Sequence, residues 1–333
     1  MISTSDQQTG LPRTAPVTAE ASGQFRYGPR EVNRMGFGGM KLTGPRLSGP
    51  PADRDGALAV LRRAVELGVQ HVETSDHYGP HVVNQLVREA LHPYADELVV
   101  VAKVGARRTP DGGWAEALTP AELRRAVHED LDQLGLDVLD VAVLRMPGMG
   151  DIPTERSLAE PLEALVELQQ EGLVRHVGVS HVTQTQVAEA LGIAPLACVE
   201  HNYNLINRAD DDLVDDLARR GIPYVAVQGL SYTTLFRVRG LTPEQSAVLG
   251  AVAQRVGGTP EQVAMAWLLA RSPNMLLIPG ATTVAELEEH LAAAALVLDP
   301  VDLAELDSFA TSRAPGPGAA VPTSPLTTTE EKP

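Results

Sequence analysis

The order of apolar runs and helical segments constrains the fold of this 333-residue chain more than any other feature. Short apolar runs, such as residues 98–103, alternate with stretches whose apolar residues repeat at helical spacing. In residues 51–67, for example, Leu58, Leu61 and Val65 repeat at the spacing of one helix face. Strict alternation of this kind requires parallel strands that are covered by helices.

Eight strand-then-helix units follow a short N-terminal β-hairpin, and two further helices have no strand of their own. Eight units close as a (β/α)8 TIM barrel more naturally than as an open sheet, and such a barrel needs about 250 residues. No G-x-G-x-x-G motif follows the first strand, which counts against a classical dinucleotide-binding sheet. The expected strands are residues 34–39, 70–74, 98–103, 139–145, 174–180, 196–200, 224–227 and 275–278.

The two ends of the chain differ in composition from the rest. Residues 1–23 and 313–333 are rich in Thr, Ser, Pro, Ala and Gly and contain few large apolar side chains. Such segments bury too little apolar surface to offset the entropy of ordering, so we expect both to be disordered tails. The sequence therefore predicts one barrel domain over residues 24–312.

The net charge and the cysteine content indicate which binding partners and which cellular compartment suit this chain. A net charge of −16 and a pI near 5.0 argue against nucleic acid or an anionic membrane as a partner. The single cysteine, Cys198, excludes an internal disulfide and fits a reducing cytoplasm. No run approaches 18 uninterrupted apolar residues, and the N-terminus lacks the order of a signal peptide. The pattern says nothing about the oligomeric state.

Polar residues follow several of the predicted strands at the point where each strand ends. Glu73 and Tyr78 flank one strand end, and Lys103 and Arg145 end the next two strands. In a parallel barrel these ends meet at one mouth, where the chemistry of such barrels occurs. A phenol of pKa about 10 becomes useful near neutral pH when cations favour its anion. The sequence therefore predicts a reactive centre, and Ser180 and Glu200 lie at the same mouth.

Seven segments match a known family pattern in order: residues 35–40, 73–79, 101–103, 139–144, 177–180, 203–205 and 278–280. On these segments the chain from about residue 33 to residue 310 resembles the aldo-keto reductase superfamily. The resemblance implies NADPH-dependent reduction of aldehydes or ketones. It also implies that a tyrosine donates the proton, a lysine paired to an aspartate lowers the tyrosine pKa, and a histidine orients the carbonyl.

The chain keeps two of these four residues and departs at the other two. The tyrosine is Tyr78 and the lysine is Lys103, whereas Glu73 stands for the aspartate and Arg145 for the histidine. Arginine is always cationic and demands an anionic partner. Two interpretations remain open: an Arg145–Glu73 ion pair that plugs the pocket, or an arginine that binds a carboxylate or enolate oxygen of the substrate.

The resemblance also indicates departures in the cofactor site. If a nucleotide binds, its site would comprise Ser180, His181, Glu200, Leu230, Arg237 and Arg239. Glu200 replaces a glutamine, and about Val227 the family has an aromatic residue that stacks on the nicotinamide. The groups for the 2′-phosphate fall on Gly280, Ala281, Glu286 and His290, with no Lys or Arg from 279 to 299. Losses of about 1–2 kcal/mol at three positions would move the Kd of NADPH well above about 100 μM.

Other polar and aromatic residues of the mouth complete the predicted site. Met40, His77 and Trp114 are candidates for the substrate pocket. Asp76, His77 and His81 could suggest a metal, but no third well-spaced ligand follows, so we expect none.

These observations lead to three hypotheses. The first is a non-redox enzyme without a cofactor, in which Tyr78 transfers protons at a carbonyl-bearing small molecule by cyclisation, dehydration or isomerisation. The second is an NADP(H)-dependent carbonyl oxidoreductase, and the third is a non-catalytic binding or regulatory protein. Retention of Tyr78 and Lys103 disfavours the third, and the departures in the cofactor site disfavour the second. The sequence alone therefore favours non-redox chemistry.

Overall fold

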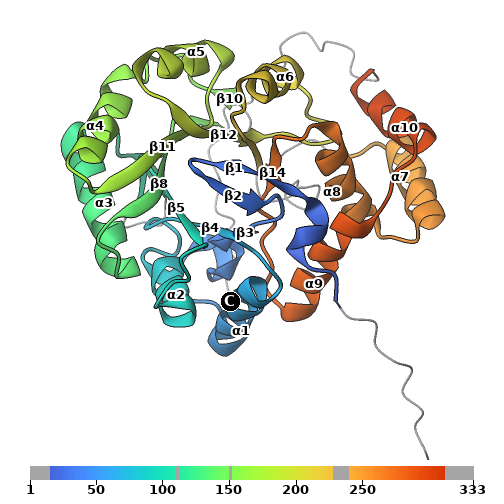
Figure 1. The fold of residues 1–333 in the computed structure, drawn as a ribbon, viewed down its shortest axis with the longest axis horizontal. Helices are drawn as coiled ribbons and strands as arrows, with labels where there is room; N and C mark the ends of the chain where they lie inside the picture. Colours follow the sequence, from blue (N-terminus) through green and yellow to red (C-terminus); the bar gives the residue numbers. More distant parts are fainter. Residues whose placement is uncertain (1–15, 110–112, 150–151, 228–239, 312–333) are drawn as a thin grey trace, which may run out of the picture.

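A closed barrel of parallel strands forms the centre of the protein. The computed structural model describes residues 16–109, 113–149, 152–227 and 240–311 (Figure 1). Its eight-stranded sheet runs in the order β3 (Phe37–Gly38), β4 (His71–Thr74), β5 (Val99–Val104), β8 (Leu139–Arg145), β11 (Val174–Ser180), β12 (Leu196–Asn202), β13 (Tyr224–Val227) and β14 (Met275–Leu277). A parallel bridge between Met35 and Leu277 joins the two ends of this sheet. The predicted (β/α)8 barrel is confirmed.

Helices surround the barrel on its outside (Figure 1). Several begin at capping boxes, in which a threonine side chain and the glutamate or glutamine three residues later satisfy free backbone N–H groups. The helices are α1 (Arg54–Glu66), α2 (Val82–Leu91), α3 (Pro120–Leu134), α4 (Ala159–Gln170), α5 (Gln184–Ile193), α6 (Asp211–Arg220), α7 (Pro243–Val256), α8 (Pro260–Arg271), α9 (Val284–Ala292) and α10 (Pro300–Thr311). None of these described helices has the length and apolar character that crossing a membrane requires.

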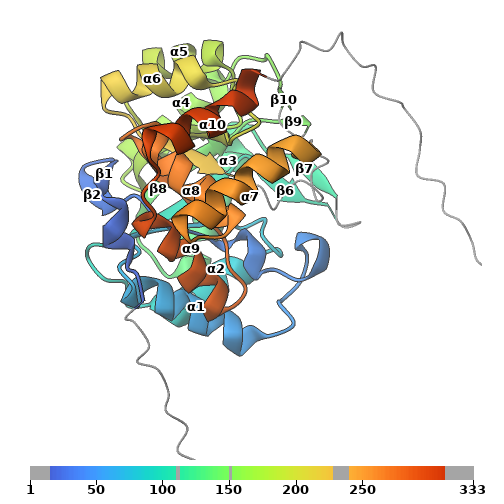
Figure 2. The same cartoon turned by 90° about the vertical axis from the view of Figure 1, so that its right-hand side faces the viewer.

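A hairpin covers the N-terminal end of the barrel. It consists of β1 (Gln24–Tyr27) and β2 (Arg30–Asn33), which pair antiparallel as predicted. The hydroxyl of Tyr27 donates to Sγ of Cys198 over 3.4 Å, and its ring meets the edge of His71. Figure 2 shows this hairpin on one side of the barrel and the short strands β6, β7, β9 and β10 on the other. The C-terminal ends of the strands therefore remain available for a site.

Two short strand pairs were not predicted from the sequence. The strands β6 (Ala106–Arg108) and β7 (Trp114–Glu116) form one hairpin at the mouth, and β9 (Gly148–Met149) pairs with β10 (Ile152–Pro153). Strands of two or three residues are too short to show an alternating pattern.

The 3-10 helix η1 (Ala19–Ser22) was not predicted either, and it lies in a segment that we expected to be disordered. Ala19 is fully buried. Oγ of Ser22 donates to the carbonyl of Ala19 over 2.6 Å and accepts from the backbone N–H of Met35 over 3.0 Å. The expectation is therefore wrong for this helix, because a few small residues packed on the barrel give no periodic signal. Residues 1–15 and 313–333 lie outside the described residues.

Candidate active site

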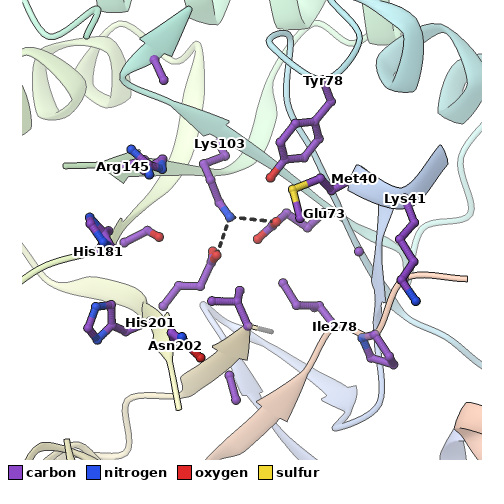
Figure 3. Close-up of a pocket in the computed structure, with 18 of the residues that line it drawn as sticks. Met40, Lys41, Glu73, Tyr78, Lys103, Arg145, His181, His201, Asn202 and Ile278 are labelled. Carbon is purple, nitrogen blue, oxygen red and sulfur yellow. Dashed lines mark hydrogen bonds and ion pairs between the residues drawn. The ribbon is translucent and has the colours of Figure 1, made fainter. Parts of the chain in front are cut away.

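A cavity of about 630 Å³ opens at the C-terminal ends of the strands (Figure 3). This volume lies within the range of small-molecule and cofactor sites. The structure brings nearly all the predicted site residues to its walls: Met40, Glu73, His77, Tyr78, Lys103, Trp114, Arg145, Ser180, His181 and Glu200. The candidates Leu230, Arg237 and Arg239 lie outside the described residues.

Lys103 lies between two carboxylates at the bottom of this cavity. Its ammonium donates to Oε1 of Glu73 over 2.9 Å and also to Oε1 of Glu200 (Figure 3). Lys103, Glu73 and Glu200 are 7%, 4% and 1% exposed, so water hardly screens these ion pairs. Sequence analysis predicted the pair with Glu73 but missed the pair with Glu200, because β5 and β12 are not neighbours in the sheet.

The carboxylates and the ammonium shift one another's pKa. Burial lowers the pKa of Lys103, but the charges of Glu200 and Glu73 outweigh burial and hold it well above its usual value. Burial raises the pKa of Glu73, and the neighbouring Glu200 raises it further, against the opposing effect of Lys103. Lys103 is therefore a permanent cation, and Glu73 retains a proton more readily than an exposed glutamate.

Tyr78 is buried beside this cluster, with 3% of its surface exposed. Burial raises the pKa of its phenol, Lys103 opposes this effect, and Glu73 and Glu200 add to it. We had expected the nearby cations to favour tyrosinate, and that expectation is wrong because desolvation and the carboxylates outweigh the ammonium. The phenol is neutral and can donate a proton.

Arg145 ends β8 and lines the same cavity. Its guanidinium donates to the carbonyl of Met146 over 3.3 Å, and burial lowers its pKa. Among the described residues Arg145 forms no ion pair within 4.0 Å, so the ion pair with Glu73 that would plug the pocket is not observed. A partly buried cation that has no carboxylate partner among the described residues and faces an open cavity is suited to an anionic ligand group.

An aromatic wall borders the cavity next to Tyr78. The His77 ring lies edge-on to Tyr78 and to Trp114, with centroid distances of 4.9 Å in both cases. Nδ1 of His77 contacts Oγ of Ser75 at 2.6 Å, and Ser75 donates to the carbonyl of Lys103 over 2.6 Å. Burial lowers the pKa of His77, and the charges of Lys103 and Arg145 lower it further, so the ring is neutral. This wall suits a flat, apolar substrate ring.

Three buried polar atoms on the cavity walls have no hydrogen-bond partner within the described part of the chain. They are Oε2 of Glu200, Nε2 of His201 and Nδ1 of His290. Buried polar groups are almost always hydrogen-bonded in proteins, so a cluster of orphaned atoms indicates that a ligand supplies the partners. Sequence analysis gave no role to His201, whose Nδ1 contacts Asp210 at 2.7 Å.

Lys41 supplies a cation that the sequence analysis did not find. It lies in the 3-10 helix η2 (Gly39–Leu42), lines the cavity beside Gly280 and pairs with Glu286 over 2.9 Å. For the 2′-phosphate we had considered cations between residues 279 and 299, and had expected Glu286 to repel a phosphate. The barrel brings Lys41 to this place from the first strand end, and its charge offsets that of Glu286.

Asp76 and His81 contact each other in the loop after β4. Within the described ranges no three His, Cys, Asp or Glu side chains gather in an arrangement that could hold a metal ion.

A (β/α)8 barrel with a buried tyrosine, lysine and carboxylate at its C-terminal mouth defines the class of the aldo-keto reductases. The model of the aldo/keto reductase family matches residues 34–311. The chain belongs to this family and is therefore an enzyme of the aldo-keto reductase type.

Known proteins similar to this chain include two oxidoreductases. The chain is 52% identical over 290 residues to a pyridoxine 4-dehydrogenase of Escherichia coli K12, which covers 87% of this chain and 99% of the relative. It is 33% identical over 294 residues to an uncharacterized oxidoreductase of Schizosaccharomyces pombe, which covers 88% of this chain and 92% of the relative.

A solved structure of an aldo-keto reductase from Klebsiella pneumoniae in complex with NADPH is also similar. It has a TM-score of 0.70 and 25% sequence identity, and the match covers 89% of this chain and 95% of that chain.

These similarities contradict the prediction of non-redox chemistry without a cofactor. The relative at 52% identity is a dehydrogenase, and a structural neighbour holds NADPH. Cyclisation, dehydration and isomerisation are therefore set aside, and so is the expectation that no nucleotide is used. Two features of the structure also weaken the arguments behind that prediction. Burial raises the pKa of Tyr78, and Lys41 lines the cavity although it lies outside residues 279–299.

Proposed function

We propose that this protein is an NADP(H)-dependent oxidoreductase that interconverts an alcohol and an aldehyde on a pyridoxine-type ring. The observation that carries this proposal is the buried, neutral phenol of Tyr78 beside the charged Lys103 in the cavity at the mouth of the barrel. The 52% identity to a pyridoxine 4-dehydrogenase over nearly its full length supports the choice of substrate.

The walls of the cavity fit the proposed cofactor. When bound, NADP(H) supplies or accepts the hydride. By the family resemblance, Ser180, His181 and Glu200 would hold the nicotinamide, and the orphaned Oε2 of Glu200 is a suitable acceptor for an amide N–H. At the other end of the cavity, Lys41 would meet the phosphate-bearing part.

Tyr78 would transfer the proton. In reduction, its neutral hydroxyl donates a proton to the carbonyl oxygen as negative charge develops there. The ammonium of Lys103 stabilises the tyrosinate that remains, because an adjacent opposite charge favours the ionised form. In oxidation the same proton passes from the substrate hydroxyl back to Tyr78.

Arg145 would orient the substrate. Pyridoxine carries an acidic ring hydroxyl on the carbon next to the one that bears its reacting hydroxymethyl group. A guanidinium that lines the cavity and lacks a carboxylate partner among the described residues would bind this oxygen as an anion. The rings of His77 and Trp114 would pack against the substrate ring. We propose a small molecule as the only substrate and, because of Cys198, a reducing compartment.

The test is an assay of purified protein in both directions. We expect pyridoxal to consume NADPH, and pyridoxine to reduce NADP+, each with formation of the matching product by chromatography. We also expect Tyr78→Phe to slow both reactions about 100- to 10,000-fold while NADPH still binds. Failure of the wild type to turn over pyridoxal while it reduces other aldehydes would overturn the substrate. Failure with every aldehyde would overturn the redox function.

A further inference from the structure

A single ammonium serves two buried carboxylates in this site. Lys103 donates to both Glu73 and Glu200, and these two side chains come from opposite sides of the barrel, since β4 and β12 are the second and sixth strands of the sheet. If both carboxylates were ionised, these three groups together would carry one excess negative charge. Glu200 has one oxygen on Lys103, and its other oxygen is buried without a partner among the described residues.

We propose that Glu200 couples the binding of NADP+ to the release of a proton from the Glu73–Lys103–Glu200 cluster, and that it thereby favours the oxidised cofactor. This inference rests on the proposed NADP(H)-dependent function. In this proposal Glu200 positions the cofactor and sets the preference for its oxidised form, whereas Tyr78 transfers the proton of the reaction.

The first step of the argument is that the empty cluster holds a proton. Two carboxylates that share one ammonium in a buried site do not both ionise readily, because each negative charge disfavours the other. Burial and the neighbouring Glu200 raise the pKa of Glu73 well above its usual value, in spite of Lys103. Glu73 is therefore the group of the cluster that retains a proton more readily than an exposed glutamate, while Lys103 contacts both carboxylates.

The second step concerns the other titratable groups around the cluster. Tyr78 above it and Tyr27 and Cys198 below it are neutral, because burial raises the pKa of all three. Burial and the nearby cations keep His77 neutral as well. None of these four groups neutralises the excess carboxylate.

The remaining neighbours lie on β8, β12 and β13 and directly after β11. On β13, burial and Asp210 raise the pKa of Tyr224, so this phenol is neutral as well. Arg145 forms no ion pair with either carboxylate among the described residues, so its charge acts only at a distance. His201 contacts Asp210, and Nδ1 of His181 contacts the carbonyl of Met146 at 3.2 Å. Lys103 thus remains the cation in direct contact with both carboxylates.

The third step is the charge of the ligand. The nicotinamide ring is cationic in NADP+ and neutral in NADPH, and the rest of the two molecules is the same. A cation beside Glu200 stabilises the fully ionised carboxylate pair, so Glu73 loses its proton when NADP+ binds. By linkage, ionisation of the pair strengthens NADP+ binding by the same factor. NADPH lacks this charge and shows no comparable effect.

The sign of the pH dependence follows. The proton is released on binding at pH values between the lowered pKa of Glu73 in the NADP+ complex and its raised pKa in the free protein. Within that window the Kd of NADP+ falls as pH rises, by up to about tenfold per pH unit. The Kd of NADPH should not follow this slope.

The experiment is titration calorimetry of the full chain with NADP+ and with NADPH, in two buffers of different ionisation enthalpy and across pH 6 to 9. The difference in apparent enthalpy between buffers counts the protons released. Both nucleotides carry the same 2′-phosphate, so its ionisation cancels in the comparison. We expect NADP+ to release up to one proton more than NADPH.

Two variants and a control locate the effect. Glu200→Gln keeps the size of the side chain but removes the second charge, so the difference in protons should vanish and the NADP+ preference should fall about tenfold or more. Glu73→Gln removes the group that carries the proton and should abolish the difference as well. Glu261→Gln removes a carboxylate from the same cavity wall, on α8, without an ion pair to Lys103, and should keep the difference.

Equal proton release by both nucleotides in the wild type would overturn the inference, and so would a full difference in the Glu200→Gln variant. In either case tight binding would leave the redox function intact. If neither nucleotide bound, the proposed function would fall together with the inference that rests on it. Should Glu200→Gln not fold, Glu73→Gln and the wild type still decide the matter.

Discussion

At the scale of single residues, burial decides what Tyr78 can do. An exposed tyrosine between two cations would tend to ionise and act as a base. In this site the phenol is desolvated and faces two carboxylates as well as Lys103, so its pKa is raised. A proton donor works only while it is protonated, so the raised pKa fits the reduction of a carbonyl at neutral and alkaline pH.

This argument predicts a pH profile. We expect the single-turnover rate of pyridoxal reduction with saturating NADPH to stay level from pH 7 to at least about 10, the ordinary pKa of tyrosine. Above its raised pKa the phenol loses its proton and the rate should fall. A decline with a midpoint near pH 8 would show that Tyr78 ionises early and would contradict the reading of the site.

Removal of the hydroxyl gives a second prediction. Tyr78→Phe keeps the ring and its contact with His77 but removes the proton donor. Proton transfer by a positioned side chain typically contributes about 100- to 10,000-fold, so kcat should fall by that factor. The Kd of NADPH, measured by fluorescence titration, should change less than about threefold. If the variant kept the kcat of the wild type, another group would be the proton donor.

Arg145 gives a third prediction, in which matched substrates act as the control. A fixed donor aimed at an oxyanion typically contributes about 100- to 1,000-fold. Arg145→Met should therefore lower kcat/KM by that factor for 2-hydroxybenzaldehyde, which has an oxygen next to the reacting carbon. For benzaldehyde, which lacks this oxygen, the loss should be less than about tenfold. Equal losses for both aldehydes would show that Arg145 does not recognise the ring oxygen.

The residues of the site were easier to predict from the sequence than their states. Strand ends placed Glu73, Tyr78, Lys103 and Arg145 at one mouth, and the structure shows them there. The contact of Lys103 with Glu200 depends on how far side chains reach across the barrel, and the protonation of Tyr78 depends on burial. The pattern of strands in the sequence predicts neither the reach of these side chains nor the burial of Tyr78.

At the scale of elements, a single β-bridge and one hydrogen bond stabilise the place where the barrel closes. Met35 bridges to Leu277 where the sheet closes, and its backbone N–H donates to Ser22 of η1. Ser22→Ala leaves this buried N–H without an acceptor, which typically costs about 1–3 kcal/mol. Urea unfolding should show this loss of stability. An unchanged midpoint would mean that the N–H finds another partner.

Local signals in the sequence mark the beginnings of several helices. Thr119, Thr242 and Thr259 each precede a proline and close a capping box, and the observed helices begin at the next residue. The hairpin β6–β7 and η1 carry no such signals. Their positions are set by packing against the barrel, which only the folded chain reveals.

At the scale of the whole molecule, the barrel closes a site from residues that are far apart in the chain. Lys41, Lys103 and Glu200 come from the first, third and sixth strands of the sheet or the turns that follow them, and all line one cavity. Inspection of residues 279–299 alone therefore missed the cation of Lys41, which lines the same cavity. The alternation of strands and helices predicted the barrel, but not which loops would face one another.

Deletions test how far the barrel extends toward the N-terminus. Removal of residues 1–15, which contain few large apolar side chains, should change the melting temperature by no more than a few degrees. Removal of residues 1–23 also deletes Ala19 and Ser22 and should lower it clearly further, because both are buried. Equal melting temperatures for the two deletions would show that η1 contributes nothing to stability.

The redox function of the whole enzyme can be tested by following a single hydrogen. Purified protein is incubated with pyridoxal and NADPH that carries deuterium at the hydride-donating carbon of the nicotinamide, and the product is analysed by mass spectrometry. Both faces of that carbon are labelled in separate preparations. We predict that one preparation yields pyridoxine with one deuterium on the new hydroxymethyl carbon, and that Tyr78→Phe yields almost none. Conversion of pyridoxal to any product without deuterium from either preparation would contradict hydride transfer and the account of the site.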